Sequence, residues 1–345
     1  MWMKRRNDKN LVRRSRLKEF SKQRRFLFYS PMKFNTSYKS YNPSNKRYEF
    51  QAPCNFSFLN NAEETISFFN EMIQLINHNR KRQFEIFIDI KNVEKLTIDA
   101  LMYLLSIINN MKNVFKRRIS IRGNIPLDSN INRLFKESGF FNYVKSTNII
   151  PIFKNSDTIQ IISGKNTDTR IARQISDFVS DKLGMTRSQC SFIYVMMIEL
   201  MSNTYKHAYA NNAVNRISNK WYCFCKYNNI EQIVSFTFMD VGAGIPTTVR
   251  KKFAEKLDFL NLKAENRYVI SALEGQFRTS TSLAYRGKGL PRIHETCQSR
   301  KIQNMRLITN KADVRDDGDV IKGRELSKPL CGTLYYCELR KENIG

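Results

Sequence analysis

The segment that most constrains the fold is an alternating strand that ends in an acid and two glycines. In VSFTFMDVGAGIP, apolar side chains alternate with polar ones up to Asp240, which predicts a half-buried strand over 232–239. Gly242 and Gly244 follow at once, and then Ile245. Two glycines spaced by one residue permit positive φ or close approach of a ligand, although ordinary turns also use them. Asp240 at this strand end is placed to accept a hydrogen bond from an exocyclic amine.

A strongly apolar helix, expected over 188–210, precedes this strand. Its sequence YVMMIELMSNTYKHAY places Glu199, Asn203 and Lys206 on one polar stripe, with His207 beside it. The rest of the surface is so apolar that we expect a buried helix, in which a lone carboxylate is costly. Alone, the stripe fits an internal hydrogen-bond network as well as a functional site.

A glycine-rich segment leads into a later helix that begins near residue 290. It reads Arg286-Gly287-Lys288-Gly289-Leu290-Pro291. Glycines before a helix N-terminus leave free N–H groups facing a ligand, and the helix dipole favours an anion there. The alternative is an ordinary glycine-rich loop with a capped helix. The spacing is not that of a Walker A motif.

In chain order, E-x-x-x-N-x-x-K-H, D-x-G-x-G-I and G-x-G-L resemble the successive boxes of the GHKL superfamily of ATPases and kinases. Cys331-Gly332-Thr333-Leu334 before a final strand resembles that family's last box on the adenine side. The resemblance covers about residues 157–341. It implies a Bergerat-type two-layer α/β sandwich with a mixed sheet, which binds ATP and Mg²⁺.

The resemblance also implies residue roles. Asn203 corresponds to the Mg²⁺ ligand, Glu199 to the base, and Asp240, with Thr333, to the group that recognises the adenine amine. Lys206 and His207 match positions near the phosphates, although His207 equally fits the core. Residues 246–288, which read as polar and irregular, correspond to a lid, and Pro291 departs from the glycine of many relatives. The remaining nucleotide contacts expected are Gly242, Gly244, Ile245, Arg286, Gly287, Lys288, Gly289 and Leu290.

Residues 48–150 read as a separate small α/β domain. Helices are expected at 97–111, at 128–138 and after Asn61, and strands at 84–90 and 118–121. The runs FIDIKNVEKLTIDALMYLL and ISIRGNIPLDSNINRLFKESGFFNYV resemble a STAS domain, the fold of anti-sigma-factor antagonists. At the family's serine phosphoacceptor position this chain has Ile98. The domain division predicted is a basic arm at 1–47, a STAS-like domain at 48–150 and a GHKL domain at 151–345.

The charge is strongly positive, at +27. Residues 1–50 carry 15 Lys and Arg but only three acids, so the arm is expected either to contact nucleic acid or to dock on a protein partner. A general Lys- and Asn-rich composition explains the charge equally well. The seven cysteines form no C-x-x-C pair, which favours reduced structural thiols, and no run of 18 apolar residues predicts a membrane span. The expected location is the cytoplasm.

Three functions fit this sequence. The first is a Mg-ATP-dependent conformational switch with slow hydrolysis, which regulates a partner. The second is a serine/threonine protein kinase of the anti-sigma-factor type, suggested by the STAS-like neighbour. The third is an ATP-binding module without turnover, against which Glu199 argues. The sequence identifies neither the partner nor the oligomeric state.

Overall fold

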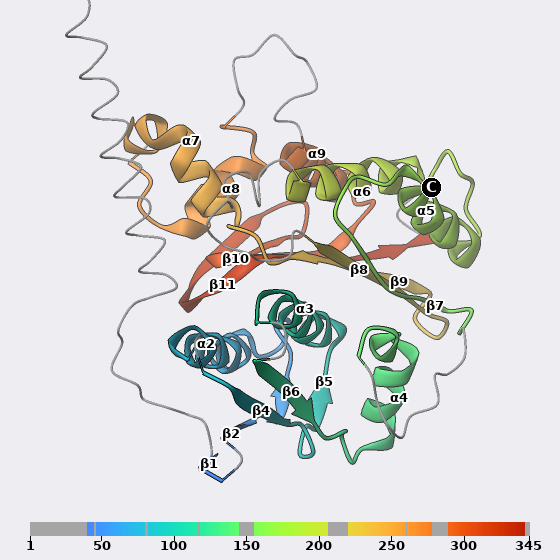
Figure 1. The fold of residues 1–345 in the computed structure, drawn as a ribbon. Helices are drawn as coiled ribbons and strands as arrows, with labels where there is room; N and C mark the ends of the chain where they lie inside the picture. Colours follow the sequence, from blue (N-terminus) through green and yellow to red (C-terminus); the bar gives the residue numbers. More distant parts are fainter. Residues whose placement is uncertain are drawn as a thin grey trace, which may run out of the picture.

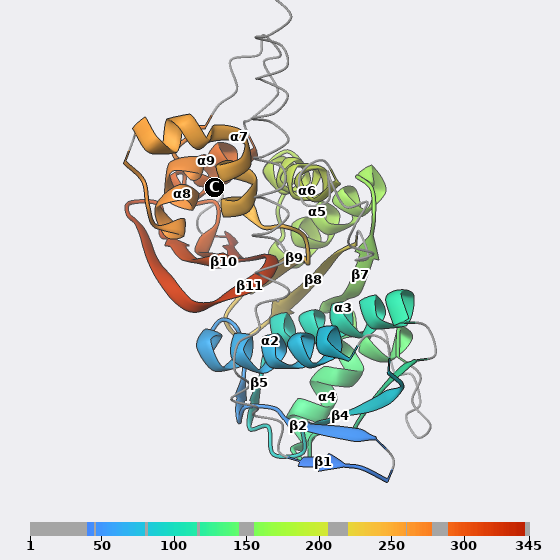
Figure 2. The same ribbon diagram turned by 60° about the vertical axis from the view of Figure 1, so that its left-hand side comes forward.

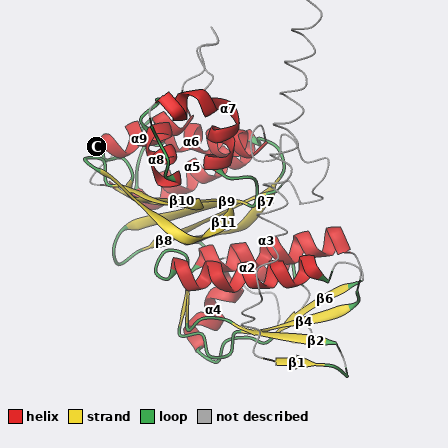
Figure 3. Ribbon diagram, turned by 90° about the vertical axis from the view of Figure 1, so that its left-hand side faces the viewer, coloured by secondary structure: helices red, strands yellow, loops and turns green. Residues whose placement is uncertain are grey.

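Helices and sheets alternate in four layers through the molecule (Figure 3). The computed structural model describes residues 40–44, 46–79, 82–115, 118–144, 155–205, 220–259, 261–277 and 289–341. Among the described residues, the earlier part of the chain forms an α/β unit of a four-stranded sheet, a separate two-stranded sheet and two long helices. The later part forms a second sheet with five helices on its far face (Figure 1). The α/β class expected from the sequence is confirmed.

The first unit is a mixed sheet whose strands lie in the order β1-β2-β4-β6. β2, β4 and β6 are parallel because helices connect them, and β1 adds an antiparallel edge. Its elements are β1 (Ser40–Asn42), β2 (Arg47–Gln51), β3 (Asn55–Phe56), α2 (Ala62–His78), β4 (Phe84–Asp89), β5 (Lys95–Leu96), α3 (Ile98–Phe115), β6 (Ile119–Gly123), α4 (Ser129–Glu137) and a 3₁₀ turn at Phe140–Asn142.

Local signals place most of these elements where the sequence predicts them. Asp128 caps α4 by accepting hydrogen bonds from the N–H groups of Asn130 and Ile131. Asn61 precedes α2 but makes no side-chain cap, because its amide donates to the Asn55 carbonyl and to Glu64 instead. β1 begins inside the segment predicted as a basic arm, whose residues 1–39 lie outside the described residues.

The second unit is a five-stranded sheet in the order β10-β11-β9-β8-β7. Every neighbouring pair is antiparallel, so the mixed sheet expected for this domain is wrong. Two hairpins, β8–β9 and β10–β11, fix the direction of four strands, and the helical connections return the chain antiparallel as well. The strands are β7 (Thr158–Gly164), β8 (Trp221–Asn228), β9 (Ile233–Asp240), β10 (Gln303–Asp316) and β11 (Ile321–Arg340).

Five helices cover one face of this sheet (Figures 1 and 2). They are α5 (Thr169–Leu183), α6 (Ser191–Asn203), α7 (Ile245–Phe259), α8 (Glu265–Leu273) and α9 (Gly289–Gln298). α7 and α8 correct the expectation that residues 246–288 are irregular. These helices bury a small hydrophobic cluster of their own that includes Val249, Leu257 and Tyr268. Because lysines are interspersed among the apolar residues, the helical spacing is not apparent in the sequence.

The opposite face of the five-stranded sheet packs on α2 and α3 of the first unit (Figure 1). One continuous hydrophobic cluster joins Phe69 and Tyr103 of these helices to Phe224 and Leu334 of the sheet. Hydrogen bonds cross the same boundary: the Asn70 amide donates to the Pro329 carbonyl at 2.9 Å. The two units therefore share a core. Among the described helices, none is long and apolar enough to cross a membrane.

The β10–β11 hairpin carries a buried ion pair at this boundary. The Arg306 guanidinium is 6% exposed, binds Asp313 through two bonds of 2.7 and 2.8 Å, and donates to the Leu59 carbonyl of the first unit. Arg324 adds a third bond to Asp313 at 2.7 Å. Burial by itself opposes ionisation of Asp313, but the bonds and charges of the two arginines hold its pKa below the usual range.

Replacing Asp313 with Asn is expected to lower the free energy of unfolding by about 3–5 kcal/mol at pH 7, because it leaves Arg306 buried and unpaired. A lowered pKa contributes stability above the unfolded value of about 3.9, and this contribution is lost as pH falls through the folded value. The difference between the two proteins should therefore shrink in urea titrations below about pH 4. Asp319→Asn, at an exposed pair with Arg300, is the control and should change stability by less than about 1 kcal/mol. An equal loss in both variants would contradict this account.

Candidate functional site

Gly289, the first residue of α9, lies directly against two residues of α6. A Cβ at this glycine would be 2.8 Å from Glu199 Oε2 and 3.3 Å from Asn203 Nδ2. A side chain at this position would require the Glu199 carboxylate to shift. The structure thus brings the predicted base and the predicted metal ligand to the N-terminus of the helix that the sequence predicts as an anion seat. Leu290 follows, half-buried at the edge of the core.

The two oxygens of the Glu199 carboxylate have different neighbours. Oε1 accepts a hydrogen bond from Arg292 Nη1 at 3.1 Å, while Oε2 faces Gly289. Glu199 and Arg292 line a groove of about 300 Å³ between α6 and α9. α6 is not buried all round as expected, since Val195 is 39% exposed. Glu199 itself is 21% exposed and opens onto this groove, so its charge is not buried without compensation.

Asp240 is the last residue of β9 and is 6% exposed. Its Oδ1 accepts the Gly242 N–H at 2.7 Å, and Oδ2 lies 3.5 Å from the Thr204 hydroxyl. Burial raises the pKa of Asp240 to about 6, in spite of these two bonds. Thr204 follows Asn203 directly, so the end of α6 joins Asp240 to the residues around Gly289.

Two residues of β10, Thr309 and Asn310, hold the turn that follows Asp240. The Thr309 hydroxyl accepts the Ile245 N–H at 3.0 Å, and the Asn310 amide donates to the Ala243 carbonyl at 3.2 Å. Gly244 has a φ of +80°, and a Cβ there would lie 2.2 Å from Asn310 Oδ1. Sequence reasoning missed Thr309 and Asn310. The one signal that could have found them is the apolar run Met305–Thr309, which is typical of a strand that can pair with the one carrying Thr333.

A bulge in β11 brings Thr333 beside Asp240. Thr309 pairs with Thr333 and Asn310 with Leu330, so two residues of β11, 331 and 332, have no partner on β10. Gly332 has a φ of +113°, and a Cβ there would be 2.0 Å from the Asp240 carbonyl. Its own carbonyl accepts the Thr309 hydroxyl at 2.9 Å. Thr333 of β11 then pairs directly with Asp240 of β9.

The structure brings the predicted site residues that it describes into two groups, one around Gly289 and one around Asp240, and Thr204 at the end of α6 connects them. The members that it describes are Glu199, Asn203, Asp240, Gly242, Gly244, Ile245, Gly289, Leu290 and Thr333. Lys206, His207, Arg286, Gly287 and Lys288 lie outside the described residues. Within the part of the chain that is described, no three His, Cys, Asp or Glu side chains cluster as a metal site.

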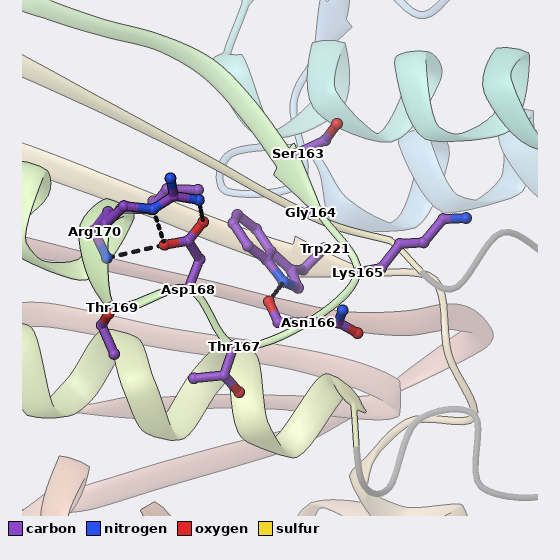
Figure 4. A pocket seen from close by; sticks show the side chains of 10 residues that line it. Ser163, Gly164, Lys165, Asn166, Thr167, Asp168, Thr169, Arg170 and Trp221 are labelled. Atoms are coloured by element: carbon purple, nitrogen blue, oxygen red, sulfur yellow. Dashed lines mark hydrogen bonds and ion pairs between the residues drawn. The ribbon is translucent and has the colours of Figure 1, made fainter.

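A second hollow, of about 450 Å³, lies at the opposite edge of the sheet, between β7 and the start of α5 (Figure 4). Asp168 caps α5 through the Arg170 N–H, and the Trp221 indole donates to the Asn166 carbonyl at 3.0 Å (Figure 4). None of the predicted site residues lines it. Asp168 and the Asn166 carbonyl are thus engaged in the helix cap and in the loop.

Comparison with known proteins adds no assignment: no protein-family model matches the chain, and no curated protein matches it either.

Asp240→Asn is expected to stabilise the protein at neutral pH while leaving it unchanged at pH 4. The raised pKa means that the folded state holds its proton more tightly than the unfolded state, so the cost of ionisation develops between about pH 4 and pH 6. The Asn side chain can still accept the Gly242 N–H without that cost. We expect a gain on the order of 1–3 kcal/mol at pH 8 in urea unfolding. A variant less stable than the unaltered chain at pH 8 would show that Asp240 stabilises the fold.

Proposed function

We propose that this chain is a Mg-ATP-binding ATPase of the GHKL type that acts as a nucleotide-driven switch on a partner. The observation that carries the proposal is the contact of Gly289 with Glu199 and Asn203, next to Thr204, whose hydroxyl lies 3.5 Å from Asp240. Sequence segments that lie far apart in the chain supply these groups. Core packing alone does not explain why a carboxylate and an amide lie against a glycine at a helix N-terminus.

Each described residue has a task in this proposal that its surroundings support. The buried Asp240 carboxylate accepts a hydrogen bond from the adenine amine, beside the hydroxyl of Thr333. The N-terminus of α9 at Gly289 provides N–H groups for phosphate oxygens. Glu199, with Oε2 directed at Gly289, is placed to orient or deprotonate the attacking water or hydroxyl.

The residues present fit a magnesium ion held jointly with the nucleotide. Mg²⁺ prefers oxygen ligands and commonly takes one or two from the protein, with substrate phosphates and waters completing its shell. Asn203, whose Nδ2 faces Gly289, also carries a side-chain oxygen of the kind that this mode uses, and a cage of several acids is not needed. When bound, the ion would neutralise phosphate charge.

A serine/threonine kinase is the second candidate, and the groove between α6 and α9 favours it. Glu199 lines this groove of about 300 Å³, which is open to solvent, so a hydroxyl side chain from another protein has a route to the base. Hydrolysis and phosphotransfer would use the same carboxylate. The basic arm's partner, whether nucleic acid or protein, stays a prediction, since residues 1–39 lie outside the described residues.

Incubation with γ-labelled ATP separates these functions. Free labelled phosphate supports the switch. Label on an added protein or on the chain itself supports the kinase, and tight binding with neither product supports a passive module.

Asp240→Ala should weaken ATP binding by roughly 10- to 150-fold, because a charge-assisted hydrogen bond is lost. Glu199→Ala should bind ATP normally and lose turnover by about 10²-fold or more. Calorimetry showing no ATP binding by the unaltered chain would refute the proposal.

Arg292 is expected to orient Glu199. Arg292→Gln should lower kcat by about 10- to 100-fold with little change in ATP affinity, since it frees Oε1 and lets the carboxylate rotate away from Gly289. Arg292→Lys should restore part of the rate. The matched control is Arg300→Gln, which breaks an exposed pair with Asp319 just beyond the same helix. Equal rates for Arg292→Gln and Arg300→Gln would remove Arg292 from the site.

A further inference from the structure

A side chain of the first unit of the protein contacts the bulge that places Thr333 beside Asp240. Residues 331 and 332 lack partners on β10, and the β9 pairing begins only at Thr333. Buried carbonyls outside a ladder need another donor. The Gly332 carbonyl has the Thr309 hydroxyl, and the Cys331 carbonyl has the hydroxyl of Tyr103, at 3.2 Å.

Tyr103 is well placed to hold this backbone. It lies in the first half of α3, is 1% exposed, and packs edge-on against Phe69 and Phe58. Its ring therefore has one position, and the hydroxyl is a fixed donor. Val241, the residue after Asp240, belongs to the same hydrophobic cluster. Burial raises the pKa of the Tyr103 hydroxyl well above its usual value, so it remains a protonated donor.

We propose that Tyr103 is a positioning residue of the nucleotide site, through which the first unit sets the affinity for ATP. The inference rests on the proposed function. Holding the Cys331 carbonyl fixes the bulge, the bulge fixes Thr333 against Asp240, and these two residues meet the adenine. Because coupling between two sites is reciprocal, ATP must in turn stabilise the packing of α3 against the sheet. A partner that displaces α3 would release nucleotide.

The chain contains a matched control for this contact. The Tyr143 hydroxyl also comes from the first unit and also donates to a backbone carbonyl of the sheet, that of Ile161, at 2.9 Å. Ile161 lies on β7, at the opposite edge from β10. Tyr103→Phe and Tyr143→Phe therefore each remove one hydroxyl that bridges the two units, and only the first bond reaches the nucleotide pocket.

The test uses the full chain and measures ATP affinity by calorimetry together with amide hydrogen exchange. Tyr103→Phe should weaken ATP binding by roughly 3- to 10-fold, the effect of one hydrogen bond, and Tyr143→Phe by less than about twofold. Exchange should quicken in peptides covering 240–244 and 331–333 only in Tyr103→Phe. Added ATP should slow exchange in α3 of the unaltered chain and do so less in that variant.

Equal affinities in the two variants, or equal losses, would overturn the inference while leaving ATP binding in place. Unchanged exchange at 331–333 in Tyr103→Phe would overturn it as well, since the bulge would then not depend on the hydroxyl. Failure of the unaltered chain to bind ATP is a different result: it refutes the proposed function, and the inference falls with it.

Discussion

The structure depends on one constraint: the five-stranded sheet has two apolar faces, and both must be covered. Helices of its own unit cover one face, and α2 and α3 of the first unit cover the other. Phe224 and Leu334, 2% and 1% exposed, would face water without that second cover. Burial of apolar area contributes about 25 cal/mol per Å², so separation of the two units would be costly. The first unit is for this reason part of the fold and not an appended module.

The candidate site lies where this sheet meets both helical layers. α6 and α9 approach it from one side, and α3 contacts the adjoining bulge from the other. Glycines allow the segments to approach one another closely. Gly244, Gly289 and Gly332 each lie so near another atom that a Cβ would clash with it. Hydroxyls and amides then fasten the backbone, as Thr309 does at two points. A site of this construction needs several layers in register at once, which explains why its members are so widely separated in the sequence.

Strong local patterns made much of this predictable. Alternation gave the strand up to Asp240, helical spacing gave α3 and α6, and the glycines before Pro291 gave the start of α9. The features that the sequence did not predict depend on pairing between segments far apart in the chain. The antiparallel sheet, the length of the β10–β11 hairpin and the bulge at 331 and 332 follow from which strands meet, and no window of sequence contains that information. Arg292, Thr309 and Tyr103 were missed for the same reason, since each acts on a residue at least 20 positions away.

The surroundings of Asp240 give a reason to assign it a ligand and not only a structural part. Its carboxylate is buried, receives one short backbone bond, and has a pKa raised to about 6 by desolvation. Asp313 is as deeply buried, yet two arginines lower its pKa. Asp313 thus forms a satisfied ion pair that holds the hairpin, whereas Asp240 carries charge at neutral pH without a cationic partner among the described residues. Strongly raised pKa values of this kind gather at functional sites. An incoming amine that donates to Asp240 would supply the hydrogen bond that the folded protein does not, so part of the free energy of ligand binding would come from relieving this cost.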